Sequence, residues 1–455
     1  MPPARALHPL YFYTPVMEHV YWTGLTFLYP KVTMDAGDRF PTQRRHSFML
    51  KGFWIRNFKS LRQVGVGSCY SKFVLIEDET NVTPHQLGPV TLFTGVNGTG
   101  KSSVVDAFSF VSDCYRYGVE AACLKQGGFD AIYSQGSKGA ITFGFQYQQK
   151  READIATYAI NIFRTKNKVP YIESEVLAYQ KGEESLPVIF LQNGTEKSIR
   201  YLAPDERLSN AELTQIEFTN HNQLGLASLT SHPKYPVLES FRSLFENWTL
   251  CCFTPDPARG LDKSLPRRHD SLHGVSLSGL VRHITKRYKN KLRPLFLRVA
   301  ATLPNVEQIL FDDSDPDKPQ LAFQLQDRNY PVPITHLSAA TIRLFTYAVL
   351  LEEDEPALLT IIEEPENGLD RENRSRFLET LCRFGETPRP ENPQVFSISH
   401  HPAVVNGMHP SQVWVFEKDS EGFTAVERAS DSILFESDAD LNDPQWFSVH
   451  FDEKR

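Results

Sequence analysis

The sequence has few cysteines and no cysteine motif. Its six cysteines include no CxxC pair, so the spacing of a zinc ribbon is absent and buried free thiols in a reducing compartment are expected. No stretch of about 18 residues is both apolar and free of charge, so no transmembrane helix is expected. The first residues lack a basic segment followed by an apolar run. These absences predict a cytoplasmic protein without a membrane role.

An excess of positive charge is also missing. The 455 residues carry a net charge of −7, with 41% hydrophobic and 23% charged residues, which is ordinary for a globular protein and excludes a general binder of polyanions. One stretch departs from this balance, because residues 256–298 hold eleven Lys or Arg against three Asp. This stretch predicts a solvated helical face, a surface for DNA phosphates, or a site for an acidic protein partner.

The pattern of residues divides the chain into five segments. Residues 1–48 show neither strand nor helix periodicity and are expected to form a poorly ordered extension, unless the natural start lies just beyond them. Residues 49–205 predict an ATPase lobe of strands around one helix, including an antiparallel meander. A helical insertion is expected over 206–320, a second lobe of alternating strands and helices over 321–430, and an acidic tail over 431–455.

A phosphate-binding motif lies at residues 95–102, where the sequence GVNGTGKS matches GxxxxGK[ST] in full. It follows an apolar strand pattern and opens a helical one, which is the context that this motif requires. Lys101 would place a charge at the β and γ phosphates of ATP, and the Ser102 hydroxyl would coordinate Mg²⁺. The residues expected at the nucleotide are Gly95, Asn97, Gly98, Thr99, Gly100, Lys101, Ser102 and Ser103.

Two acidic residues end a second apolar strand pattern at residues 359–364. A buried strand that ends in two acids is what a Walker B motif needs. In that arrangement Glu363 would hold the Mg²⁺ shell, and Glu364 would orient or deprotonate the attacking water. The pattern is weak by itself, because many strands end in charged residues.

Two further motifs resemble those of the ABC ATPase superfamily. Residues 363–370, EEPENGLD, resemble its Walker B and D-loop run DEPTSALD, which makes Asp370 the D-loop acid. About thirty residues later, His400 follows another strand pattern and resembles the H-loop histidine, whose imidazole reaches the γ-phosphate. The resemblance implies catalytic roles for Glu364 and His400.

Two other motifs resemble the RecF-like and SMC-like members of that superfamily. Residues 336–344 look like the LSDGTLR signature, in which Ser338 would touch the ATP of a second copy, although Ala339-Ala340 replaces Asp-Gly. Residues 53–61 match the opening I-x-N-F-K/R-S strand, so Lys59 is expected near the phosphates. The chain lacks the long heptads of SMC proteins, and too few residues follow the H-loop for the Toprim domain of OLD nucleases.

The resemblance implies an α/β fold, namely a P-loop NTPase of ABC/RecF type with an antiparallel β lobe and a helical insertion between Walker A and Walker B. It also implies an ATP-dependent homodimer that works on DNA or on a separate effector protein, in DNA repair or anti-phage defence. The alternative is a nucleotide-gated scaffold with little turnover, which the altered signature favours. A small-molecule kinase is a third hypothesis, against which the D-loop and H-loop argue.

Overall fold

The structure is a computed structural model of the whole chain, which divides into two compact units, residues 1–45 and 46–455. All of the described residues belong to the second unit. They are 48–68, 85–149, 155–181, 184–192, 196–200, 213–216, 222–229, 245–246, 248–252, 291–312, 320–432 and 443–447. The expectations for the N-terminal extension, for most of the basic stretch 256–298 and for most of the acidic tail concern residues outside this set.

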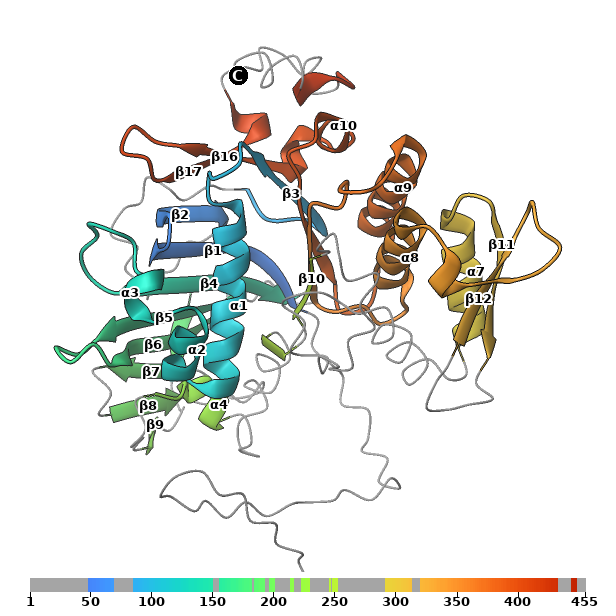
Figure 1. Cartoon of the computed structure of the whole chain (residues 1–455). Coiled ribbons are helices and arrows are strands. Elements are labelled where there is room, and N and C mark those ends of the chain that lie inside the picture. Colours follow the sequence, from blue (N-terminus) through green and yellow to red (C-terminus); the bar gives the residue numbers. More distant parts are fainter. Residues whose placement is uncertain are drawn as a thin grey trace, which may run out of the picture. The chain divides into compact units, whose positions relative to one another are not determined.

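A six-stranded sheet with the order β10-β14-β15-β3-β16-β17 forms the centre of the second unit (Figure 1). Its strands are β10 (Trp248–Cys252), β14 (Leu359–Glu363), β15 (Gln394–Ile398), β3 (Val90–Gly95), β16 (Val413–Lys418) and β17 (Thr424–Arg428). The first five run parallel, and β17 is antiparallel to β16. Because parallel strands end at the same edge of a sheet, the residues that follow β3, β15 and β14 meet there.

The three strands that carry the predicted motifs are confirmed. β3 and β15 are buried along their whole length, and β14 is buried up to its last residue. A strand that is buried on both faces has a continuous apolar run rather than an alternating one, which is why these segments stood out in the sequence.

The predicted meander is confirmed as part of an eight-stranded antiparallel sheet, with the order β2-β1-β4-β5-β6-β7-β8-β9. Its strands are β1 (Phe48–Phe58), β2 (Leu61–Gly67), β4 (Ile141–Gln149), β5 (Ile155–Arg164), β6 (Pro170–Lys181), β7 (Glu184–Gln192), β8 (Glu196–Arg200) and β9 (Leu213–Ile216). Helix α1 (Lys101–Tyr117) crosses the face of this sheet in Figure 1. The short helices α2 (Val119–Lys125), α3 (Phe129–Ile132) and α4 (Gly225–Leu229) lie beside it.

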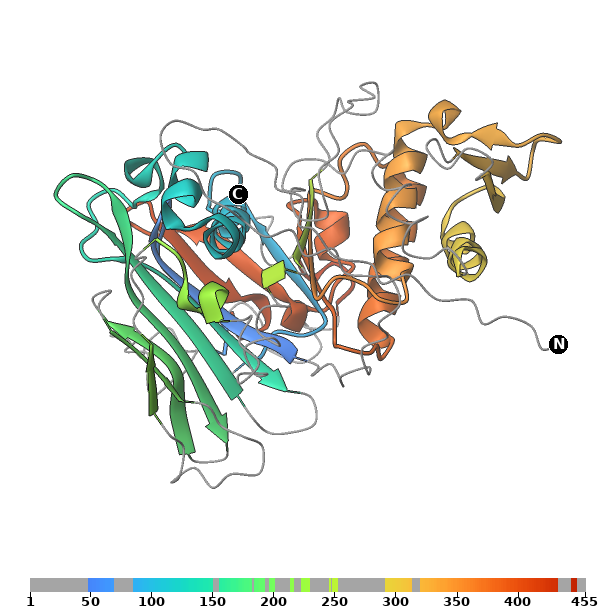
Figure 2. The same ribbon diagram turned by 90° about the horizontal axis from the view of Figure 1, so that it is seen from below.

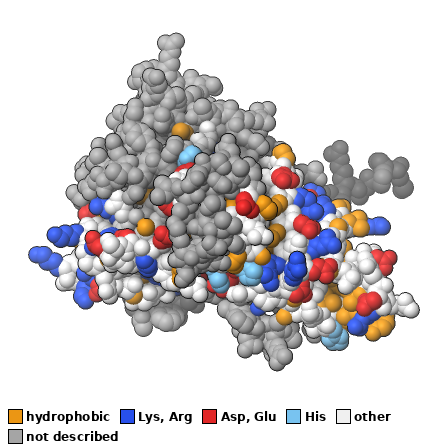
Figure 3. Space-filling model, turned by 90° about the horizontal axis from the view of Figure 1, so that it is seen from above, with side chains coloured by type: hydrophobic (Ala, Val, Ile, Leu, Met, Phe, Trp, Pro, Cys, Tyr) orange, Lys and Arg blue, Asp and Glu red, His pale blue; other side chains and the backbone are white. Residues whose placement is uncertain are grey.

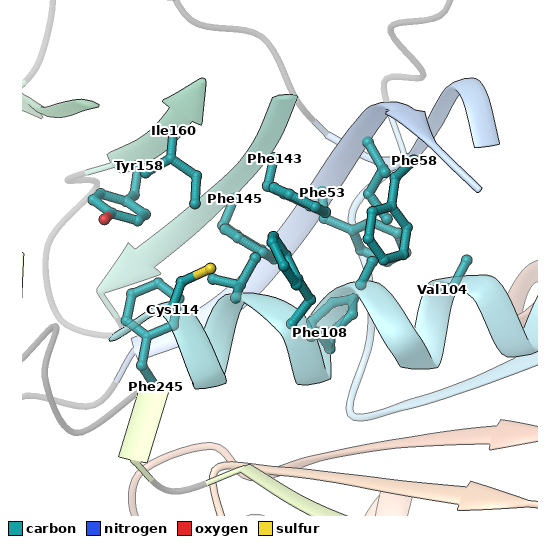
Figure 4. Packing of buried hydrophobic residues seen from close by; sticks show 14 of the residues in the cluster. Phe53, Phe58, Val104, Phe108, Cys114, Phe143, Phe145, Tyr158, Ile160 and Phe245 are labelled. Atoms are coloured by element: carbon teal, nitrogen blue, oxygen red, sulfur yellow. The ribbon is translucent and has the colours of Figure 1, made fainter. Parts of the chain in front are cut away.

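Helix α1 joins the two sheets through one aromatic core (Figure 4). The ring of Phe108 lies 5.4 Å from that of Phe145 on β4 and 5.9 Å from that of Phe396 on β15, measured between centroids. Phe53 of β1 contacts the same ring at 5.0 Å. Such edge-to-face pairs add to the burial of large apolar surface. The packing fixes the start of α1, and therefore the phosphate-binding loop, against the central sheet.

A second apolar core lies on the other face of the central sheet, against α8 (Ala339–Glu352) and α9 (Arg371–Glu386). Figure 2 shows both helices on the side of this sheet away from the antiparallel strands. Helix α7 (Leu292–Thr302) packs beyond them with a three-stranded sheet of β11 (Val306–Asp312), β12 (Gln320–Leu325) and β13 (Val332–Pro333). Helix α10 (Pro402–Val405) follows β15.

The expectation of a helical insertion over 206–320 is wrong for several described residues. Besides α4 and α7, these residues form β9, β10 and β11, and β10 pairs with β14 inside the central sheet. The apolar run of β10 is only five residues long, and periodicity cannot separate such a run from a turn of buried helix.

No helix within the described ranges is long and apolar enough to cross a membrane. Cys114, Cys123 and Cys251 are buried free thiols, as expected, whereas Cys382 is a free thiol of intermediate exposure.

Candidate nucleotide site

The phosphate-binding loop connects β3 to α1, as the motif predicts. Lys101 begins α1, and its ammonium donates hydrogen bonds to the carbonyl oxygens of Gly95 at 2.6 Å and Val96 at 2.8 Å. The side chain of this lysine is 7% exposed, so its charge is held inside the curve of the loop. Gly100 precedes the helix with φ +107°, a conformation that L side chains rarely adopt. The backbone therefore turns tightly around a concentrated positive charge.

The start of β17 supports this loop, and the sequence motifs gave no sign of it. The hydroxyl of Thr424 donates to the carbonyl of Thr99 at 2.7 Å, and Thr424 Oγ1 also bonds to the Ser60 hydroxyl at 3.2 Å. The Ser60 hydroxyl lies 3.3 Å from that of Ser103. The strand turn that carries Ser60 is therefore bound to both the loop and the first turn of α1.

Glu363, at the end of β14, lies within hydrogen-bonding distance of Ser102 in the first turn of α1. The Ser102 hydroxyl donates a hydrogen bond of 2.5 Å to Glu363 Oε1. An alcohol and a carboxylate oxygen at this separation are the hard ligands that Mg²⁺ prefers. No described group of three or more His, Cys, Asp and Glu side chains could hold a metal ion unaided. The pair fits a Mg²⁺ ion that completes its shell with phosphate oxygens and water.

Glu364 adopts a backbone conformation that is unusual for a residue with a side chain. Its φ is +47°, and its N–H donates to the carbonyl of Ile398 at 2.8 Å, which ties the residue to the end of β15. The left-handed region costs a non-glycine residue about 1–2 kcal/mol. Such strain often marks functional positions. The conformation turns the carboxylate out of the strand direction, where Asn367 Nδ2 donates to its Oε2.

The two histidines after β15 have different surroundings. His400 is 40% exposed, and its Nδ1 lies 4.0 Å from a carboxylate oxygen of Glu364 and 4.0 Å from one of Glu366. His401 instead contacts Arg374 through Nε2 at 2.6 Å and accepts the N–H of Ala403 through Nδ1. Burial, and next the Arg374 charge, lower the pKa of His401, so this ring stays neutral near pH 7. His401 is therefore held by contacts within the chain, whereas the partly exposed ring of His400 is accessible to a ligand.

Part of the chain matches a known protein family. Residues 204–406 match the family model described as "AAA domain, putative AbiEii toxin, Type IV TA system". The match covers Walker B, the D-loop and both histidines, and the phosphate-binding loop joins them at one edge of a parallel sheet. This family match and the shared sheet edge support an ATPase domain of the ABC type in this part of the chain.

Solved structures similar to this ABC-type ATPase core include three SMC head domains. One is bound to the C-winged helix domain of ScpA, with 15% identity, 83% coverage of this chain, 97% of that chain and a TM-score of 0.44. One from Thermotoga maritima has 16% identity, covers 84% and 98%, and scores 0.39. One derived from Pyrococcus furiosus, bound to the C-terminal domain of ScpA, has 13% identity, covers 84% and 96%, and scores 0.45. Scores below 0.5 carry no functional argument. No curated protein matches the sequence of the chain significantly.

Ser338 and Asp370, the residues predicted for the signature and the D-loop, each stand at the start of a helix. The Ser338 side chain is exposed and accepts the N–H of Thr341 at 3.1 Å, which caps α8. Asp370 caps α9 in the same way, and the N–H of Asn373 lowers the pKa of its carboxyl. Arg343, one turn into α8, donates to the carbonyl of Asn367 in the D-loop. The sequence did not single out Arg343, which ties these two motifs together.

Lys59 does not lie free at the phosphates. Its ammonium pairs with Asp106 at 2.6 Å and donates to Gln126 at 3.0 Å. Asp106 is four residues beyond Ser102 on α1, so this pair flanks the phosphate-binding loop. Lys59 therefore supports α1 in the structure, and direct contact with a nucleotide would require it to leave Asp106.

Proposed function

We propose that this chain binds ATP with Mg²⁺ and hydrolyses the ATP. One observation carries the proposal: the edge shared by β3, β14 and β15 gathers Ser102, Glu363, Glu364 and His400. Four residues from three separate motifs meet where the carboxyl ends of parallel strands form a ligand site. A purely structural role would not explain a serine–carboxylate pair and a strained glutamate beside the phosphate-binding loop.

Each residue has a role in the proposed reaction. The amides of residues 95–102 and the Lys101 charge hold the β and γ phosphates. Ser102 and Glu363 would hold Mg²⁺, which would supply positive charge to neutralise the phosphates. The Glu364 carboxylate orients the attacking water or takes its proton, and His400 contacts the γ-phosphate from the end of β15.

Steady-state ATP hydrolysis tests this proposal. Glu364→Gln removes the base, so we expect ATP binding to persist while turnover falls by about 10²-fold or more. Glu372→Gln is the matched control, because Glu372 is an exposed residue of α9 outside the site. If Glu364→Gln hydrolyses ATP at the wild-type rate, the assignment of the base is wrong.

We further propose that ATP closes a two-fold dimer. Within one copy, Ser338 is exposed at the start of α8, where its hydroxyl caps its own helix. A second copy could bring this serine and its helix N-terminus to the γ-phosphate. Light scattering of Glu364→Gln with ATP and Mg²⁺ should then show a doubled mass, and Ser338→Arg should abolish the doubling. A mass that does not depend on nucleotide would contradict the dimer.

We propose that such a dimer acts on DNA or on a separate effector protein, in DNA repair or anti-phage defence. Most of the basic stretch 256–298 lies outside the described residues, and the face in Figure 3 mixes charges of both signs. The second candidate is the scaffold with little turnover, favoured by Ala339-Ala340 at the start of α8. ATPase rates with and without added DNA separate these possibilities, since a scaffold would bind ATP tightly but hydrolyse it slowly in both.

A further inference from the structure

Glu366 has a buried carboxylate that the proposed reaction does not use. It lies in the turn after β14, and the residue is only 7% exposed. Its Oε1 accepts a hydrogen bond of 2.7 Å from the Ser399 hydroxyl, whereas its Oε2 is buried and has no hydrogen-bond partner among the described residues. An ionised carboxylate in such surroundings is strongly unfavourable unless a donor reaches it.

A donor of the right kind lies next to this carboxylate. His400 Nδ1 is also buried, has no hydrogen-bond partner in the described part of the chain, and lies 4.0 Å from Glu366 Oε1. This distance is too long for a hydrogen bond, but a movement of about 1 Å by the ring or the carboxylate would make one. Within the described part of the chain, His400 is the basic side chain paired with Glu366.

Glu364 competes for the same nitrogen, because its Oε1 also lies 4.0 Å from His400 Nδ1. Its side chain is 42% exposed, however, and its other oxygen already accepts from Asn367. Water can therefore satisfy Glu364 but has little access to Glu366. Ser399, the residue directly before His400, further fixes the Glu366 carboxylate in place. These differences favour Glu366 as the acceptor.

We propose that Glu366 is a positioning residue for His400. Its carboxylate accepts the Nδ1–H of the imidazole and so orients Nε2 toward the γ-phosphate, to which the doubly protonated ring donates its Nε2–H. A carboxylate on one ring nitrogen fixes both the tautomer and the orientation of a histidine. The part of this inference that concerns phosphate rests on the proposed function of His400, whereas the contact between the two side chains does not.

The ring tautomer gives a direct test that needs no catalysis. Nitrogen-15 NMR of the wild-type protein, with His400→Asn used to assign the resonance, should show His400 protonated at Nδ1 when neutral. Glu366→Met removes the carboxylate acceptor at nearly the same side-chain size and should shift the tautomer toward Nε2–H. A neutral ring protonated at Nε2 in the wild type would overturn the proposal without any Glu366 variant.

Turnover gives the second test. Glu366→Met should lower kcat by about 10²-fold, as expected for a misplaced acid–base partner, with KM for ATP within about twofold of wild type. Combined with His400→Ala, it should cause no further loss, because both changes remove the same function. Ser399→Ala should shift kcat in the same direction by a smaller factor, since the carboxylate remains. Multiplying effects in the double variant would contradict the proposal.

A matched control separates positioning from stability. Glu352 is also buried, at 8% exposed, and pairs with Arg383 at 2.7 Å on the far side of α8 and α9. Glu352→Met should lower the melting temperature while leaving the His400 tautomer and kcat unchanged. If the wild type hydrolyses no ATP, the proposed function fails, and the tautomer alone still decides whether Glu366 holds His400.

Discussion

Three glycines test how closely the phosphate-binding loop packs against β17. Gly98 and Gly100 lie in the loop, and Gly422 lies in the turn before β17. Gly98, Gly100 and Gly422 all have positive φ, at +83°, +107° and +85°. An added Cβ would meet no atom within 4 Å at Gly98 or Gly422, but at Gly100 it would lie 2.2 Å from Thr424 Oγ1 and 2.8 Å from Ser60 Oγ. The backbone conformation is comparable at the three positions, and only the space around Cβ differs.

The expected costs follow from those two terms. A left-handed alanine costs about 1–2 kcal/mol, so Gly98→Ala and Gly422→Ala should each destabilise the chain by roughly that amount. At Gly100 the overlap with Thr424 and Ser60 adds about 1–3 kcal/mol for forced movement of packed groups. Gly100→Ala should therefore cost roughly 2–5 kcal/mol in total.

Urea unfolding without nucleotide, followed by circular dichroism, measures the three free energies. Gly100→Ala should have the lowest midpoint, and Thr424→Ala should recover part of the loss in a double variant because it removes the closest overlap. If Gly100→Ala were no less stable than Gly422→Ala, the contact between β17 and the phosphate-binding loop would be wrong.

Three further predictions concern stability and reactivity. Glu175 is fully buried and accepts hydrogen bonds from the Tyr158 hydroxyl and from two N–H groups at the start of α4, so Glu175→Gln should cost about 2–4 kcal/mol in urea unfolding, and Glu173→Gln should cost little. Burial raises the pKa of Tyr147 and Tyr158, and Glu175 raises that of Tyr158 further. Because the unfolded chain therefore loses these protons at a lower pH than the folded chain, the free energy of unfolding should fall above about pH 10. A free energy of unfolding that stays constant to pH 12 would contradict this. Among Cys114, Cys123, Cys251 and Cys382, half-buried Cys382 should be alkylated first under native conditions, as mass spectrometry can show, since the other three are buried.

The sequence predicted best what depends on short contiguous motifs. The parallel strands β3, β14 and β15 are short apolar runs, but each leads directly into a recognisable motif, and the fold class followed from the resemblance of these motifs. The order of strands in the sheet could not be seen in the sequence, and β10 was missed because its five-residue run is no longer than that of β14 or β15 and leads into no motif.

The candidate site was only partly predictable for a similar reason. Ser102, Glu363, Glu364 and His400 each stand in a recognisable motif. Thr424, in contrast, supports the loop from more than 300 residues away and belongs to no motif. Glu366 lies within the D-loop run, but its burial and its neighbours emerge only when β14 and β15 pair. Lys59 was expected at the phosphates, but it forms an ion pair with Asp106, a partner on α1 that the sequence alone does not reveal.

The central claim is that the loop at residues 95–102 is a nucleotide site, and the ATP-induced shift in melting temperature tests it most directly. Mg²⁺-ATP at a hundredfold excess over Kd should stabilise the wild type by about 2.7 kcal/mol. Lys101→Ala removes the charge inside the loop and should abolish this shift, whereas Lys166→Ala, a change at an exposed turn, should leave it intact. An unchanged shift in Lys101→Ala would show that ATP binds elsewhere or not at all.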